Sequence, residues 1–112
     1  MKIITKKIKL EELNEMAKNM FGNLVKAVVD IEKKIMAVDG ELHADEETLL
    51  LENGSTQKNL WGINIYPEMQ EDFIEFDSMI NIRPSMGNKT RGIEDEKIKK
   101  IIFEVIDDLI IK

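Results

Sequence analysis

The side chains of this chain that could act on a charged ligand are few, and several of them fall in one segment. Both arginines, Arg83 and Arg91, lie in INIRPSMGNKTRGIED, which spans residues 80–95. A glycine-containing connector that leads into a helix can present backbone N–H groups to an oxyanion, and two guanidinium groups can close on it. The candidate ligand-binding residues are therefore Arg83, Ser85, Asn88 and Arg91, together with Asn64 and Asn81.

Two features of the same segment argue against an anion site. The helix expected to follow it begins with Glu94, Asp95 and Glu96, whose carboxylates complement the positive end of the helix dipole and repel an anion. The spacings GxxxxGK[ST] and GxGxxG, which are typical of phosphate-binding loops, do not occur. The alternative is that Arg83 and Arg91 pair with local carboxylates and fix a long loop. We expect this structural role for Arg83.

The only histidine, His43, stands among acidic residues in LHADEE. Histidine beside carboxylates can bind a divalent metal or form an acid–base pair. On a strand His43, Asp45 and Glu47 would point to one side, whereas on a helix they would fan apart. There is no HExxH motif and no second histidine, so no metal site is expected, and a surface or hairpin-stabilising role is the alternative to catalysis. The candidate catalytic residues are His43, Asp45, Asp77, Arg83 and Arg91.

Composition limits the classes of protein. With 112 residues, 43% of them hydrophobic, the chain can form one domain over residues 1–112 with a single core. The absence of cysteine excludes disulfides and thiolate chemistry. A formal net charge of -6 repels polyanions on average, so nucleic acid is not an expected partner. No apolar run approaches the roughly 20 residues that span a bilayer, so we expect a soluble cytoplasmic protein without membrane contact. No cofactor is expected.

Two amphipathic helices are predicted, one near each end of the chain. Apolar residues three and four apart run from Leu10 to Phe21, and Gly22 follows as a stop signal. A broader apolar stripe predicts a second helix from about Glu94 to Ile111. A short β-prone stretch at residues 2–4 precedes the first helix.

Between the helices the apolar spacing changes to two, which is typical of strands. The run over residues 25–37 ends at Asp39-Gly40, a dipeptide that favours a two-residue hairpin turn. This register places Met36 opposite His43 and sets opposite charges across from each other in the residues that follow.

Three further segments complete the expected sheet. Residues 43–53 are compatible with a strand or a short helix, and the strand is favoured because Asn53-Gly54 is a hairpin signal. LWGINIY predicts the next strand, and the alternation in FIEFDSMINIR predicts another with one buried face. The result is an α+β fold, an antiparallel β-meander of about four strands with N- and C-terminal helices covering one face.

The blocks HADEE, LWGINIYP, IEFDSMINIRPS and GNKTRG occur in this order between residues 43 and 92, and the similarity that they indicate covers nearly the whole chain. Together they resemble a small family of bacterial and archaeal proteins that is known only as a domain of unknown function. The resemblance implies no activity, cofactor or catalytic residue. It also implies that relatives carry a glycine in place of Lys34 and another near Asp39.

The first functional hypothesis is a small interaction or binding protein. Two helices cover one face of a sheet, so the other face remains incompletely covered, and it carries Val28, Leu49 and Leu51 beside polar residues. Apolar side chains on such a face favour association with a second copy, so a homo-oligomer is the expected partner.

The alternative hypothesis is a small enzyme that acts on a phosphate-containing ligand. It requires His43 to lie within reach of Arg83 or Arg91, because an acid–base group and an anion-binding group must converge on the reacting atoms. A small anionic ligand is the partner that this hypothesis implies. A monomer with a concave polar cleft would favour the enzyme over the interaction protein.

Overall fold

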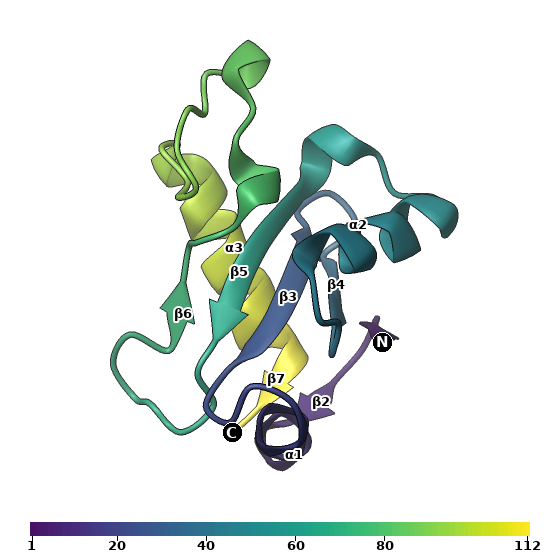
Figure 1. Cartoon of the computed structure of the whole chain (residues 1–112), viewed down its shortest axis with the longest axis vertical. Helices are drawn as coiled ribbons and strands as arrows, with labels where there is room; N and C mark the ends of the chain where they lie inside the picture. Colours follow the sequence, from purple (N-terminus) through teal and green to yellow (C-terminus); the bar gives the residue numbers. More distant parts are fainter.

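A five-stranded sheet with helices on both of its sides forms the centre of the molecule (Figure 1). The computed structural model describes residues 1–112. In chain order the helices and strands are β1 (Lys2–Ile4), β2 (Ile8–Lys9), α1 (Leu10–Asn19), β3 (Val25–Asp30), β4 (Ile35–Val38), α2 (His43–Glu52), β5 (Leu60–Ile65), β6 (Ile74–Glu75), α3 (Glu96–Leu109) and β7 (Ile110–Ile111). The predicted α+β class, the antiparallel sheet and the two terminal helices are confirmed.

The strand order is β1-β4-β3-β5-β6, and every neighbouring pair in this sheet is antiparallel. β3 and β5 form the longest pairing, from Val25 opposite Ile65 to Asp30 opposite Leu60. β4 and β5 lie on opposite sides of β3, so the connection that contains α2 crosses over the sheet. β2 and β7 form a separate parallel pair that joins the two ends of the chain.

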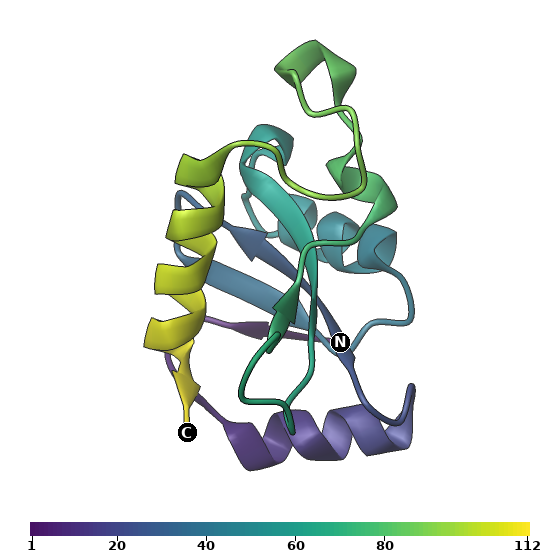
Figure 2. The same ribbon diagram turned by 90° about the vertical axis from the view of Figure 1, so that its left-hand side faces the viewer.

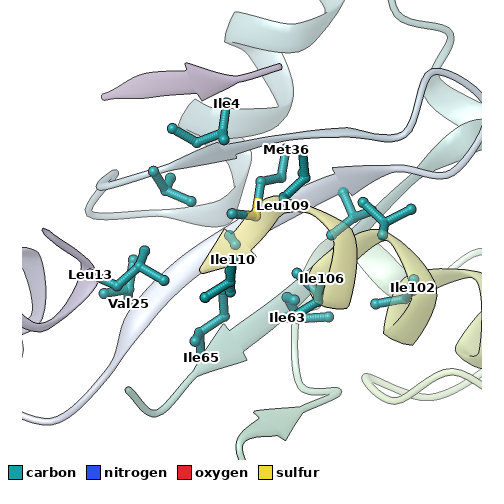
Figure 3. Packing of buried hydrophobic residues seen from close by; sticks show 14 of the residues in the cluster. Ile4, Leu13, Val25, Met36, Ile63, Ile65, Ile102, Ile106, Leu109 and Ile110 are labelled. Atoms are coloured by element: carbon teal, nitrogen blue, oxygen red, sulfur yellow. The ribbon is translucent and has the colours of Figure 1, made fainter. Parts of the chain in front are cut away.

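The main core lies between the sheet and the helices α1 and α3 (Figure 3). The apolar residues of α3 are spaced three and four apart and therefore share the buried side of the helix. They are Ile102, Val105, Ile106 and Leu109. Each side chain of this size stabilises the fold by about 1.5–3 kcal/mol when it is fully buried. The side chain of Asp95 caps α3 by accepting a hydrogen bond from the N–H of Lys97 at 2.8 Å.

Helix α2 lies on the opposite side of the sheet from α3 (Figure 2). Its Leu50 packs on Val28, and both side chains are fully buried in a second, smaller cluster. The expectation of an open apolar face is therefore wrong beneath α2, where Leu49 is also half-buried. Only Leu51 of the three expected patch residues is exposed. The part of this face near Asn64 is not covered by α2, and the candidate site lies there.

The β3–β4 hairpin turns at residues 31–34 and not at Asp39-Gly40. Asp30 is buried, and its Oδ1 accepts hydrogen bonds from the backbone N–H groups of Glu32 and Lys33, both at 2.9 Å. A carboxylate that bonds to the backbone two or three residues later stabilises a turn. The predicted hairpin register is therefore wrong.

The strand register follows from the earlier turn. Met36 pairs with Val29 on one side and Ile4 on the other, and it does not face His43. Lys34 and Asp39 both have positive φ, 58° and 67°. Glycine adopts this conformation without strain, whereas lysine and aspartate adopt it less readily.

Residues 43–52 form helix α2, so the favoured strand is wrong and the helical alternative is right. The buried side chains of this helix are His43, Glu46 and Leu50. Two of these three are polar, which explains why the apolar spacing did not predict a helix. Asp45 lies on the exposed side, so His43 and Asp45 do not share a face as a strand would require.

The segment FIEFDSMINIR does not form the predicted long strand. Only Ile74 and Glu75 pair with β5, and a 3-10 turn, Met79–Asn81, follows. The buried side chain of Asn81 replaces the missing strand, because its Oδ1 accepts from the N–H of Gly62 at 2.8 Å and its Nδ2 donates to the carbonyl of Gly62 at 2.9 Å. The segment beyond it, with a second 3-10 turn at Pro84–Met86, projects from the body of the molecule (Figure 2).

None of the helices combines the length and the apolar character that crossing a membrane requires.

Candidate functional site

A cavity of about 200 Å³ lies at the end of the sheet face that α2 leaves uncovered. Its floor is formed by Lys26 and Asn64, which are direct partners on the neighbouring strands β3 and β5. Its walls come from the first residues of α2, from residues 77–80 and from Arg91. The polar side chains at the cavity are Lys26, His43, Asn64, Asp77, Ser78 and Arg91.

His43 is the first residue of α2, and its ring is turned toward β5. Its Nε2 lies 2.7 Å from the carbonyl oxygen of Ile63. A carbonyl oxygen can only accept a hydrogen bond, so Nε2 carries the proton and Nδ1 keeps a free lone pair. Burial lowers the pKa of His43, although the hydrogen bond to Ile63 acts in the opposite direction. The imidazole is therefore neutral at neutral pH and can accept a proton at Nδ1.

Arg91 and Lys26 supply positive charge to the same cavity. Arg91 Nε lies 2.7 Å from Asp77 Oδ1, so the pair is joined through one guanidinium nitrogen and one carboxylate oxygen. Lys26 forms no ion pair, and its ammonium nitrogen lies 5.0 Å from the centre of the Phe21 ring. With a neutral His43, the two cations and one carboxylate leave the cavity with a net positive charge in a protein whose formal net charge is -6.

Gly62 allows His43 and Ser78 to lie over the same position of β5. A Cβ atom on Gly62 would stand 2.5 Å from Ser78 Oγ and 3.2 Å from His43 Cδ2. The first distance is shorter than any normal contact, so a side chain at this position would displace Ser78 or the histidine. The Ser78 hydroxyl is itself buried and accepts a hydrogen bond from the N–H of Ile80 at 3.3 Å.

Asn64 lies at the cavity, but its amide is hydrogen-bonded to Glu75. Nδ2 donates to Glu75 Oε1 at 2.9 Å, and Oδ1 is buried without a hydrogen-bond partner in the chain. Asn64 therefore shapes the floor of the cavity, and one of the two N–H groups of its amide is engaged by Glu75.

Arg83 does not reach this cavity and is held by the protein. Its Nη2 donates to the carbonyl of Leu60 at 2.6 Å and lies 3.3 Å from Glu47 Oε2, while the guanidinium lies 4.8 Å from the centre of the Trp61 ring. Burial lowers the pKa of Arg83, and the carboxylate of Glu47 opposes this change. Arg83 Nη1 is buried without a partner. The geometry agrees with the structural role expected for Arg83.

Several other sequence candidates hold the loop together or lie away from the cavity. Asn88 is buried, and its Nδ2 donates to the carbonyl groups of Asn81 and Gly92 at 2.7 and 2.8 Å. Ser85 lies in the projecting segment beside Arg83, at a second cavity of about 470 Å³. Asp45, Asn81, Arg83, Ser85 and Asn88 are therefore not brought to His43.

Sequence reasoning missed one of the charged residues at the cavity, Lys26. In the sequence it reads as one of the polar positions that alternate along a strand, and nothing local distinguishes it from a solvated lysine. The cross-strand pairing of Lys26 with Asn64 gives it its place, and this pairing depends on residues that are far apart in the chain. No group of three or more His, Cys, Asp or Glu side chains is placed to hold a metal ion.

The fold and the cavity define a small α+β domain with a polar, positively charged recess at one end of its sheet. The chain belongs to a family described as a protein of unknown function, DUF5674, whose sequence model matches residues 2–109. Neither the curated proteins nor the solved structures contain a match to the chain. The family confirms the resemblance seen in the sequence, and the function has to be argued from the cavity.

Proposed function

We propose that the protein binds a small anionic group, of the size of a phosphate, in the cavity between α2 and residues 77–80. The observation that carries the proposal is the convergence of His43, Lys26 and Arg91 on one recess. This arrangement supports the enzyme hypothesis in the form that uses Arg91, because Arg83 is engaged elsewhere.

Charge supports an anionic ligand. Arg91 is paired with Asp77 at Nε, and the ammonium of Lys26 forms no ion pair within the chain, so both side chains have further donors for a ligand. A recess with a net positive charge concentrates anions even when the whole protein repels them. The ligand should therefore be small enough to enter the recess without approaching the acidic remainder of the surface.

Size supports the same conclusion. The recess holds about 200 Å³, whereas pockets for drug-sized ligands hold about 300–1,000 Å³. A phosphate or carboxylate group fits such a volume, and a whole nucleotide does not. A larger ligand would place only its anionic end in the recess.

His43 gives the site a catalytic capability. Its Nδ1 is an unprotonated acceptor at neutral pH, held in place by the hydrogen bond from Nε2 to Ile63. A general base needs this combination of a free lone pair and a fixed orientation. If the ligand is a substrate, His43 is the group that removes a proton from a bound hydroxyl or water.

Titration of the purified protein with inorganic phosphate tests the proposal. Wild-type protein should be stabilised against thermal unfolding by phosphate at constant ionic strength, by about 2.7 kcal/mol when the ligand is at 100 times its Kd. Arg91→Gln and Lys26→Gln should each weaken this protection, because each removes a cation from the recess. Lys100→Gln is the matched control on the exposed side of α3. Equal protection of wild type and Arg91→Gln contradicts the proposal.

The interaction hypothesis is retained as a second proposal, with a different surface. The segment that projects beyond residue 78 carries exposed apolar side chains, Met79 at 66%, Ile82 at 38% and Met86 at 46%. We propose that any self-association uses these side chains, since the sheet face that was expected to be open is covered by α2.

A further inference from the structure

We propose that the cavity selects an oxyanion that carries a proton, namely hydrogen phosphate, over a fully ionised oxyanion of the same shape such as sulfate. This inference rests on the proposed function and names the class of its ligand. The inference follows from the hydrogen-bond acceptors at the cavity, whereas the proposed function follows from the cationic side chains of Lys26 and Arg91.

The first acceptor is His43 Nδ1. The hydrogen bond between Nε2 and the carbonyl of Ile63 fixes the tautomer, so Nδ1 offers a lone pair and no proton. Nδ1 has no hydrogen-bond partner in the chain, and it is not among the buried polar atoms that lack one, so it remains accessible. A ligand that faces it must therefore bring a hydrogen-bond donor.

The second acceptor is the carboxylate of Asp77. Its Oδ1 lies 2.7 Å from Arg91 Nε, and the side chain is 41% exposed, so the carboxylate can accept further hydrogen bonds from a ligand. An ionised carboxylate can only accept hydrogen bonds. Because Arg91 compensates its charge, Asp77 does not cancel the attraction of the recess for an anion, but it still repels an oxygen that has no proton.

The two cations and the two acceptors line one recess, so a ligand meets both kinds of group together. Hydrogen phosphate has ionised oxygens for Lys26 and Arg91 and at least one P–OH group for His43 or Asp77. Sulfate has the same tetrahedral shape and no proton at neutral pH, so it satisfies the cations and leaves the acceptors unpaired. Phosphate therefore forms a hydrogen bond to a charged acceptor that sulfate cannot form, which predicts a preference for phosphate of about tenfold or more.

Isothermal titration calorimetry with sodium phosphate and sodium sulfate at pH 7.5 and equal ionic strength tests this inference. Wild-type protein should bind phosphate at least about tenfold more tightly than sulfate. Asp77→Asn should reduce the ratio several-fold, because the amide can donate a hydrogen bond to sulfate. Asp107→Asn makes the same change of charge on the exposed side of α3 and should keep the wild-type ratio.

The possible results separate the two proposals. Equal affinity of the wild type for both ions overturns the selection and leaves the proposed anion site standing. Absence of binding by either ion overturns both proposals. A full preference for phosphate that persists in folded Asp77→Asn, checked by its circular dichroism, also overturns the selection as it is argued from Asp77.

Discussion

Glu46 carries a carboxyl group with no exposure to solvent, one helical turn after His43. One of its oxygens accepts a hydrogen bond from the N–H of Gly40 at 2.8 Å, and the other has no partner. Burial raises the pKa of Glu46 to about 9, although the N–H of Gly40 favours the ionised form. The side chain is therefore protonated at neutral pH, and the structure contains a neutral carboxylic acid beneath α2.

This pKa predicts how stability depends on pH. The folded protein keeps the Glu46 proton between pH 4.5 and about 9, whereas the unfolded chain loses it, so the free energy of unfolding falls as pH rises through this range. The slope is at most about 1.4 kcal/mol per pH unit. Glu46→Gln should remove it and stabilise the protein by about 1–3 kcal/mol at pH 7, as measured by urea unfolding at several pH values.

Glu52→Gln is the control for this experiment, because Glu52 is exposed on the same helix. His43 contributes in the opposite direction, since its lowered pKa makes protonation favour the unfolded chain as pH falls below 6.5. The alkaline part of the curve therefore reports on Glu46. If the free energy of unfolding has the same pH dependence in wild type and in Glu46→Gln up to pH 9, Glu46 is not protonated in the folded protein.

Among the helices and strands, α3 allows the clearest prediction of how a substitution destabilises the fold. Val105 is 2% exposed and lies in the centre of the buried stripe. Val105→Asp places a carboxylate in this core without a partner, which should cost several kcal/mol, on the order of 3–5, and leave little folded protein. Lys100→Asp introduces the same side chain on the exposed side of α3 and should change stability by less than about 1 kcal/mol.

Thermal unfolding followed by circular dichroism checks this prediction. A cooperative transition of Val105→Asp at the wild-type temperature would show that α3 does not pack on the sheet as described.

The elements that sequence reasoning predicted correctly are those in which apolar residues fill most of the buried positions. The helices near both ends and the strand LWGINI satisfy this condition. Helix α2 does not meet this condition, because His43 and Glu46 occupy two of its three buried positions. The hairpin signal at Asn53-Gly54 therefore led to the prediction of a strand. The hairpin turn was predicted at the wrong position because the real turn is stabilised by the side chain of Asp30. No dipeptide typical of hairpin turns marks residues 31–34.

The candidate site was predicted in part for a similar reason. His43 and Arg91 belong to rare residue types in this chain, which has one histidine and two arginines, whereas Asp77 was a candidate because it lies close to Arg83 and Arg91 in the sequence. Their meeting with Lys26 depends on α2 being a helix and on the pairing of β3 with β5. The segment after β6 could not be predicted. The side chain of Asn81, and not a neighbouring strand, makes the hydrogen bonds to the backbone of Gly62, and the spacing of apolar residues gives no sign of this.

For the whole molecule, the formal net charge of -6 opposes contact between copies. The proposed association through Met79, Ile82 and Met86 is apolar, so screening the repulsion should strengthen it. We expect the fraction of dimer in sedimentation velocity to rise when salt is increased from about 0.01 M to about 0.15 M, where the Debye length falls from about 30 Å to about 8 Å.

Met86→Gln should lower the fraction of dimer without changing the net charge. Met20→Gln is the matched control, since Met20 is exposed to a similar extent, 41%, near the end of α1. Monomers at every salt concentration and at high protein concentration would remove the second proposal and leave the anion site unaffected.

The parallel pair of β2 and β7 joins two segments that must find each other during folding. Ile8 pairs with Ile110, and Ile110 belongs to the same core as the residues of α3. Ile8 and Ile110 lie far apart in the sequence, so their pairing closes a long loop, and closing a long loop costs more chain entropy than forming the β3–β4 hairpin. The pairing of β2 with β7 should therefore form late in folding, after the hairpin, and such distant contacts slow the folding of the whole domain.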